Sequence, residues 1–176
     1  MVVLRYQTKN GPADNCGGSL INNRYVLTAA HCVKTRNSVR PICLPVDEKV
    51  RETHVPKYTI TGWGTTEKQT VSPDLLQAFI SHVSIPECQQ KMDENFLSVT
   101  LADPWQMCAK GANRTDACKG DSGGPLGATV AVKGDPKFVQ FGIVSAGGHF
   151  CGMESVPGIY TRVPAYMNWI VANIRP

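Results

Sequence analysis

The stretch from Asp116 to Pro125 constrains this chain most, because it places one serine inside a cluster of glycines. It reads Asp-Ala-Cys-Lys-Gly-Asp-Ser-Gly-Gly-Pro, and its glycines allow a tight turn that a second backbone segment can approach closely. In such a turn the N–H groups of Gly120 and Ser122 can converge on the point where an oxyanion forms when a serine hydroxyl attacks a carbonyl. The alternative is a glycine-rich hairpin with a solvent-facing serine.

Glycine and proline are frequent along the whole chain, which favours short strands joined by turns. The 176 residues include 16 Gly and 12 Pro, and no long helical periodicity occurs before the C-terminus, so we expect an all-β fold. The expected elements are strands at 2–4, 18–21, 25–27, 58–64 and 75–83, a polar turn at 9–14, and helices at 86–95 and 163–176. In the last helix an apolar stripe is expected at Tyr166, Trp169, Ile170, Asn173 and Ile174.

Composition excludes several classes of function. The net charge of +4 comes from scattered Lys and Arg, so no basic stripe indicates a nucleic-acid partner. No run approaches the 18 apolar residues of a membrane span. Seven cysteines without a C-x-x-C pair favour an oxidising compartment over a zinc or thioredoxin-type site.

A candidate base for Ser122 lies near the start of the chain. His31 ends the segment Thr-Ala-Ala-His before Cys32, and a serine hydroxyl needs an imidazole at hydrogen-bond distance to take its proton. A lone histidine is more often structural. The pairing of T-A-A-H-C with G-D-S-G-G-P, in this order, resembles the chymotrypsin-like (trypsin family) serine endopeptidases. Further matching pieces are C-G-G-S at 16–19, P-I-C-L-P at 41–45, T-G-W-G at 61–64, G-I-V-S at 142–145 and P-G-I-Y at 157–160.

The resemblance implies a double β-barrel and a role for each matched residue. The fold is expected to be all-β, with an incomplete N-terminal barrel (1–50), a C-terminal barrel (51–162) and a C-terminal helix (163–176). His31 and Ser122 are implied as catalytic, and Gly120 and Ser122 as the oxyanion hole. A specificity pocket that selects Lys or Arg is implied at Asp116, Gly147 and Gly158, and Asp121 is implied as the partner of an activation amine. No metal or organic cofactor is implied.

The same resemblance implies a disulfide scheme for six of the seven cysteines. The implied pairs are Cys16 with Cys32, Cys88 with Cys108, and Cys118 with Cys151. Cys43 is left over, and together with V-R-P-I-C-L-P at 39–45 it resembles clip-domain proteases, in which this cysteine bridges to an upstream segment. A buried free thiol is the alternative for Cys43.

The family pattern is interrupted between Val33 and Pro41, where only seven residues stand. In the family this interval holds several strands and a D-I-A-L-type motif, whose aspartate orients the histidine. No such motif occurs here, and Asp47, the nearest candidate, lies downstream of the P-I-C-L-P segment. Met1 falls inside the first expected strand, so we expect Asp121 to lack its amine; a solvent-exposed turn residue is the alternative for Asp121.

These observations predict a serine endopeptidase domain that cleaves after Lys or Arg, with activity impaired by the absent segments. The expected partners are protein or peptide substrates and an upstream domain linked through Cys43. The expected location is extracellular, although the chain begins without a signal peptide. The alternative function is a non-catalytic protease homologue acting as a binding or regulatory module. Asn113 begins an N-glycosylation sequon, whose occupancy stays open.

Overall fold

The computed structural model describes residues 2–8, 11–21, 25–29, 42–66, 71–147, 152–153 and 155–174. Its first part is a three-stranded antiparallel sheet in the order β1-β2-β3. The strands are β1 (Val2–Thr8), β2 (Gly11–Leu20) and β3 (Val26–Leu27). β2 begins at Gly11, so the prediction of a turn over the whole of 9–14 was wrong: ladder pairing with β1 extends from Val2↔Gly18 to Thr8↔Gly11.

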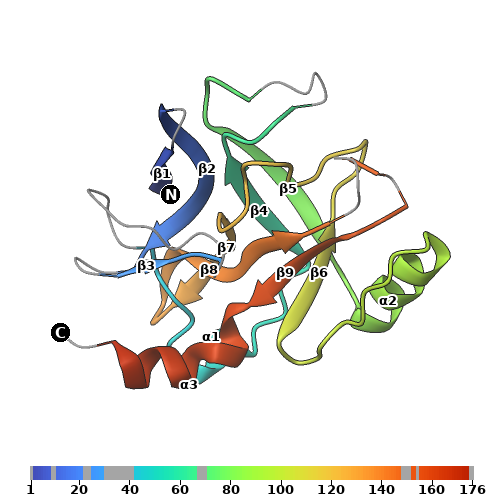
Figure 1. Ribbon diagram of the computed structural model, residues 1–176. Coiled ribbons are helices and arrows are strands. Elements are labelled where there is room, and N and C mark those ends of the chain that lie inside the picture. Colours follow the sequence, from blue (N-terminus) through green and yellow to red (C-terminus); the bar gives the residue numbers. More distant parts are fainter. Residues whose placement is uncertain are drawn as a thin grey trace.

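The second part is a closed antiparallel barrel in the order β4-β5-β6-β9-β8-β7 (Figure 1). Its strands are β4 (Lys57–Gly62), β5 (Leu76–Val83), β6 (Gln106–Lys110), β7 (Pro125–Val132), β8 (Asp135–Ala146) and β9 (Gly158–Arg162). Closure leaves no free sheet edge, because β4 pairs with both β5 and β7. Alternate residues of β4 face the barrel core, and Tyr58 and Ile60 are each 6% exposed.

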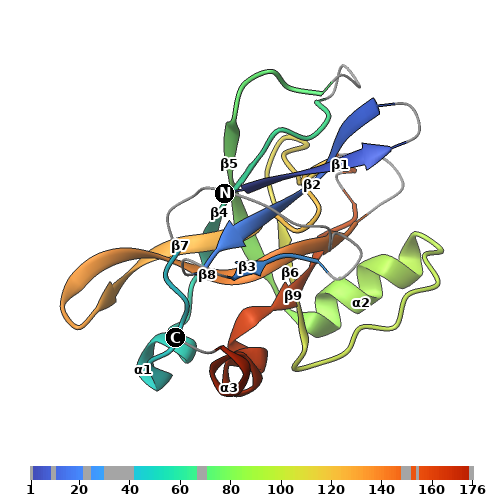
Figure 2. The ribbon, with the colours of Figure 1, turned by 60° about the vertical axis from the view of Figure 1, so that its left-hand side comes forward.

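Three helices cover the ends of this barrel. They are α1 (Glu48–Arg51), α2 (Ile85–Glu94) and α3 (Val163–Asn173). α2 begins after Ser84, whose hydroxyl accepts a hydrogen bond from the Glu87 N–H, a usual N-cap arrangement. In both ribbon views α1 and α3 lie side by side (Figure 2), and Arg51 donates to the Asn168 side chain at 3.0 Å.

The C-terminal helix is confirmed, and its buried face agrees in part with the predicted stripe: Ile170 is buried, and Tyr166 and Ile174 pack against the same cluster. Val163, Met167 and Ile170 are buried, whereas Trp169 is 65% exposed. The helix packs against Ile143 of β8 and also against Ile21, which follows β2, and Leu27 of β3. The prediction therefore holds at three of its five positions, whereas Trp169 and Asn173 are exposed and the sequence pattern missed Val163 and Met167.

Together these elements confirm the fold class. The structure is mostly β, with one closed barrel, a smaller sheet of three strands in its described part, and a C-terminal helix. No described helix is long and apolar enough to span a membrane.

Candidate active site

The loop that carries Ser122 is fixed by a chain of backbone hydrogen bonds. The Asp121 N–H donates to the Cys118 carbonyl at 3.0 Å, and the Gly124 N–H donates to the Asp121 carbonyl at 2.8 Å. The Ser122 carbonyl accepts from the Gly17 N–H at 2.8 Å. Internal hydrogen bonds therefore stabilise the turn, and a further hydrogen bond connects it to strand β2 of the first sheet.

Gly120 has the backbone conformation that the tight turn requires. Its φ of +98° lies in the left-handed region, which disfavours any side chain. In the described part of the chain, its N–H donates to no acceptor. A donor held by the turn and left without an acceptor is what an oxyanion hole requires.

The Asp121 carboxylate lies under the loop and is held by two backbone donors. It accepts from the Gly64 N–H at 2.8 Å and from the Cys118 N–H at 2.9 Å. Burial raises the pKa of this carboxyl, and the two N–H donors oppose the rise. A Cβ on Gly62 would collide with the carboxylate, so glycine is needed at the end of β4. The side chain is oriented inward, which contradicts the alternative of a solvent-facing turn residue.

Gly123 brings the serine loop against the segment that leads to His31. Its φ is +81°, and a Cβ there would collide with the Gly17 carbonyl and the Thr28 hydroxyl. The same Cβ would lie 3.2 Å from the Ala29 nitrogen. Thr28 itself donates to the Gly17 carbonyl at 2.7 Å. Gly123, next to Ser122, therefore lies close to Ala29, two positions before His31, while His31 itself lies outside the described residues.

The three predicted pocket residues lie together around Gly158. A Cβ on Gly158 would lie 3.1 Å from Asp116 Oδ1, and one on Gly147 would lie 3.9 Å from the Gly158 Cα. Tyr160, which the sequence analysis did not single out, joins them: its hydroxyl would lie 3.0 Å from the same Gly158 Cβ. The motif P-G-I-Y at 157–160 contains this tyrosine, and period-2 alternation on a strand places Gly158 and Tyr160 on one face.

Burial makes the Asp116 carboxyl unusual. It raises the pKa of Asp116 from 3.8 to about 6, against a hydrogen bond from the Ala117 N–H, and the Asp121 charge adds to the rise. The Tyr160 hydroxyl is buried without a hydrogen-bond partner among the described residues, and burial and the Asp116 charge raise its pKa well above 10.0. A mostly buried carboxylate beside glycine walls is suited to a cationic side chain that can reach it.

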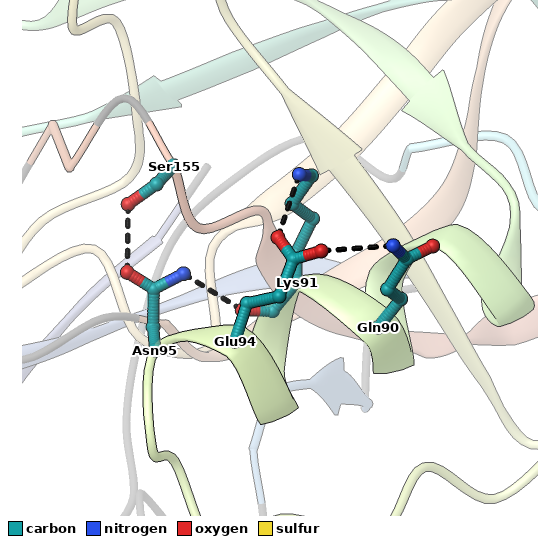
Figure 3. Close-up of polar contacts among 5 residues, drawn as sticks. All are labelled: Gln90, Lys91, Glu94, Asn95 and Ser155. Carbon is teal, nitrogen blue, oxygen red and sulfur yellow. Dashed lines mark hydrogen bonds and ion pairs between the residues drawn. The ribbon is translucent and has the colours of Figure 1, made fainter.

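The segment before Gly158 is anchored to the end of α2, as Figure 3 shows. The Ser155 hydroxyl donates to Asn95 Oδ1 at 2.8 Å, and the Asn95 amide donates to the Lys91 carbonyl at 2.8 Å. Glu94 accepts from Lys91 and from Gln90, each at 2.8 Å. This surface network holds Ser155, which lies three residues before Gly158 of the predicted pocket.

The cysteines match the expected scheme where the structure describes them. Cys88 and Cys108 form a disulfide, as predicted. Cys16 is also disulfide-bonded, but its expected partner Cys32 lies outside the described residues, as does Cys151, the expected partner of Cys118. Cys43 is an exposed free cysteine, so the alternative of a buried thiol was wrong.

Two further sequence hypotheses can be compared with the described residues. Asp47 accepts a hydrogen bond from the Lys49 N–H at 2.9 Å. It is the N-cap of α1, so its carboxylate stabilises the first turn of that helix. Among the described residues, no group of three or more His, Cys, Asp or Glu side chains could hold a metal ion.

Comparison with known proteins identifies the family. The family model described as Trypsin matches residues 1–40 and 33–170. The chain belongs to the trypsin family. Serine protease grass of Drosophila melanogaster is 33% identical over 242 residues, covering 97% of this chain and 63% of the relative. CLIP domain-containing serine protease B15 of Anopheles gambiae is 37% identical over 154 residues, covering 85% of this chain and 40% of the relative.

A solved structure supports the same assignment for the fold. The crystal structure of the Drosophila Grass clip serine protease of the Toll pathway superposes with a TM-score of 0.76 at 31% identity, covering 96% of this chain and 66% of that chain. The trypsin-family chain thus spans less than two thirds of the length of these relatives.

The comparisons also locate the interruption in the family pattern. The alignment with serine protease grass extends over 242 residues, more than the 176 residues of this chain, so the relative contains positions without a counterpart here. The two matches to the family model meet at residues 33–40. This is the interval in which the sequence lacks an aspartate-bearing segment.

Proposed function

We propose that this trypsin-family domain performs acyl transfer on peptide bonds after Lys or Arg, with Ser122 as nucleophile and His31 as general base. The observation that carries the proposal is the close approach of Gly123 to Thr28 and Ala29, which supports a position of His31 near the serine. A free Gly120 N–H supports an oxyanion hole in the same loop.

The proposed reaction follows the double displacement of this family. Ser122 Oγ attacks the substrate carbonyl while its proton passes to His31. The N–H groups of Gly120 and Ser122 stabilise the oxyanion, and the C–N bond breaks as His31 protonates the leaving amine. Water then attacks the acyl-enzyme through the same base, which releases the carboxylic acid and restores Ser122.

Asp116 supports the preference for Lys or Arg. Its carboxylate lies beside Gly158 and near Gly147, where glycines leave room for a long side chain. A substrate cation stabilises the ionised form of a carboxyl whose pKa burial has raised. The preference for Lys or Arg therefore depends on the negative charge of Asp116, whose burial is unfavourable until a substrate cation neutralises it.

We further propose that the chain is a slow protease, because the interval between Val33 and Pro41 holds no aspartate to orient His31. In the type enzymes of this family, losing that aspartate's function lowers kcat by about 10⁴ and leaves the imidazole in the wrong tautomer. The same gap favours the second candidate function, a binding or regulatory module without catalysis.

Cys43 supports a covalent link to a segment outside this sequence. Its thiol is exposed and free, and its carbonyl accepts from the Gln140 N–H at 2.9 Å, so its backbone is fixed on strand β8. We propose that it forms an intermolecular or interdomain disulfide in an extracellular protein, in keeping with the disulfide of Cys88 and Cys108. Mass spectrometry of the non-reduced, alkylated protein tests this, and a bridge from Cys43 to another cysteine of this chain contradicts it.

Peptidyl phosphonates that react once with a nucleophilic serine test the catalytic proposal even if turnover is slow. Two probes that differ only in Arg or Phe before the reactive phosphorus are compared by intact-mass spectrometry. We expect Ser122 to be labelled at least tenfold faster by the Arg probe, with the preference lost in Asp116→Ser and kept in Asp103→Ser. Faster labelling by the Phe probe contradicts the specificity, and no labelling of Ser122 by either probe supports the non-catalytic module.

A further inference from the structure

A cavity of about 500 Å³ lies at the end of the barrel opposite the Ser122 loop. Strand β4 ends at Gly62 beside Asp121, while Tyr58, near its start, lines the cavity. Strand β9 begins at Gly158 beside Asp116 and ends at Arg162, which also lines the cavity. At about 3.3 Å per strand residue, each strand separates the two sites by about 13 Å. In Figure 1 this is the end where α1 and α3 lie.

Two arginines at this cavity form no ion pair with a carboxylate among the described residues. Arg51 donates to the carbonyls of Pro45 and Val46 and to Asn168 Oδ1, all neutral acceptors. Only the backbone N–H of Arg162 donates a hydrogen bond within the described chain, and its guanidinium forms none there. Because partly buried polar groups usually have a partner, the five unused N–H donors of this guanidinium can take a ligand as acceptor.

Tyr58 adds a hydroxyl without a partner in the described chain. The residue is 6% exposed. Fully buried polar atoms without a partner belong to Ser19, Gln140 and Tyr160; the unpartnered hydroxyl of Tyr58 is not one of them, so it is not fully buried. The small exposed surface of Tyr58 therefore includes this hydroxyl, at the cavity that the residue lines. Burial raises the pKa of Tyr58 to about 12, with the Arg162 charge opposing the rise, so the group is an O–H donor at neutral pH.

Histidine rings and carboxylates complete the polar lining. The rings of His54 and His82 meet edge to face with centroids 6.2 Å apart. Burial lowers the pKa of His82, as do the charges of His54 and Arg162, while Glu87 opposes them. The side chains of Glu52 and Asp103 also line the cavity, and like His54 and His82 they are exposed, whereas Arg162 is half-buried.

We propose that this cavity binds a sulfate or phosphate group, with Arg162, the Tyr58 hydroxyl and His82 as its donors. A tetrahedral oxyanion offers several acceptor oxygens to donors on different strands that line one cavity, and charge-assisted bonds to guanidinium are the strong ones. The volume exceeds that of one such ion and lies in the range of small-molecule sites. Apolar walls at Val55, Ile85, Met107 and Phe141 suit an anion carried on a sugar-sized body.

The test follows the ring resonances of His54 and His82 by NMR while sodium sulfate or sodium phosphate replaces sodium chloride at constant ionic strength. We expect saturable shifts in the wild-type chain. The apparent Kd is expected to rise at least tenfold in Arg162→Gln and about three- to tenfold in Tyr58→Phe. Lys137→Gln, which removes the same charge from the exposed start of β8, is the matched control and should leave the Kd unchanged.

A sulfated disaccharide and its unsulfated form distinguish the source of the group. Tighter binding of the sulfated sugar than of sulfate identifies a polysaccharide substituent, and equal or weaker binding identifies the free ion; either result supports the site. Tyr58→Phe decides the matter if Arg162→Gln fails to fold. The proposal is overturned if no saturable shift occurs, if folded Arg162→Gln binds as the wild type does, or if Lys137→Gln weakens binding equally.

Discussion

The Asp121 carboxylate accepts a hydrogen bond of 2.8 Å from the Gly64 N–H, across 57 residues of sequence. With the second bond from the Cys118 N–H, this contact ties the Ser122 loop to the end of β4. Two backbone donors on one buried carboxylate fix the loop more firmly than loop packing alone, because each unsatisfied N–H would cost about 1–3 kcal/mol.

Replacing Asp121 by Asn tests this anchor. An amide keeps one acceptor oxygen but presents N–H groups where the carboxylate accepts its second bond, so we expect a loss of about 1–3 kcal/mol in the free energy of unfolding. Urea denaturation measures the loss. Asp135→Asn, in the exposed β7–β8 hairpin, is the control and should stay within about 0.5 kcal/mol of the wild type. Equal stability of the two variants would show that the anchor is unimportant.

Gly123 and Gly134 form a matched pair for the contact between the two parts of the fold. Both have positive φ, +81° and +91°, but a Cβ on Gly134 meets nothing within 4 Å, whereas one on Gly123 collides with Gly17 and Thr28. Alanine should cost about 1–2 kcal/mol at Gly134 from backbone conformation. At Gly123 we expect about 1–3 kcal/mol more from overpacking. Thermal or urea unfolding of both variants gives the difference, and equal costs would contradict the close packing.

The fold and part of the site could be predicted from the sequence, because the glycines and the pocket aspartate occur in local motifs. Asp116, Gly147 and Gly158 lie together as the resemblance implies. The buried face of α3 was predicted in part, since Tyr166, Ile170 and Ile174 belong to it, but the contribution of Val163 and Met167 was missed. The cavity around Arg162 has no local signal either, since its lining comes from five stretches that are far apart in the sequence, at 51–58, 82–86, 103–107, 141 and 162–164.

The pKa of Asp116 predicts a pH dependence of cation binding. Its folded value is about 6, raised from 3.8, so the carboxylate is ionised above pH 6 and protonated below it. The affinity for an aromatic amidine should therefore fall about tenfold per pH unit as pH decreases below 6. Calorimetric titration from pH 8 to pH 5 measures this. Asp116→Asn should bind weakly without pH dependence, and a flat profile in the wild type would contradict the assignment.

The raised pKa of Asp116 also predicts how the stability of the fold depends on pH, with a trend opposite to that of cation binding. A carboxyl with a raised folded pKa contributes stability that is complete below its unfolded pKa and is lost as pH rises through about 6. Neutral Asp116→Asn should thus be more stable than the wild type at pH 7–8, by up to about 3 kcal/mol for a shift of about two pKa units. Urea unfolding at pH 4.0 and pH 7.5 checks the sign, and a destabilised variant at pH 7.5 would contradict it.

The most direct test of the central claim is the rate at which a fluorophosphonate labels Ser122. The chain is compared with a version in which the corresponding segment of serine protease grass is inserted between Val33 and Pro41, and with His31→Ala in each. The account predicts labelling of Ser122 in both chains, about 10³–10⁴ slower in the chain without the insert, and further loss on His31→Ala in the restored chain. Equal rates in the two chains, or a restored chain whose Ser122 is not labelled, would contradict it.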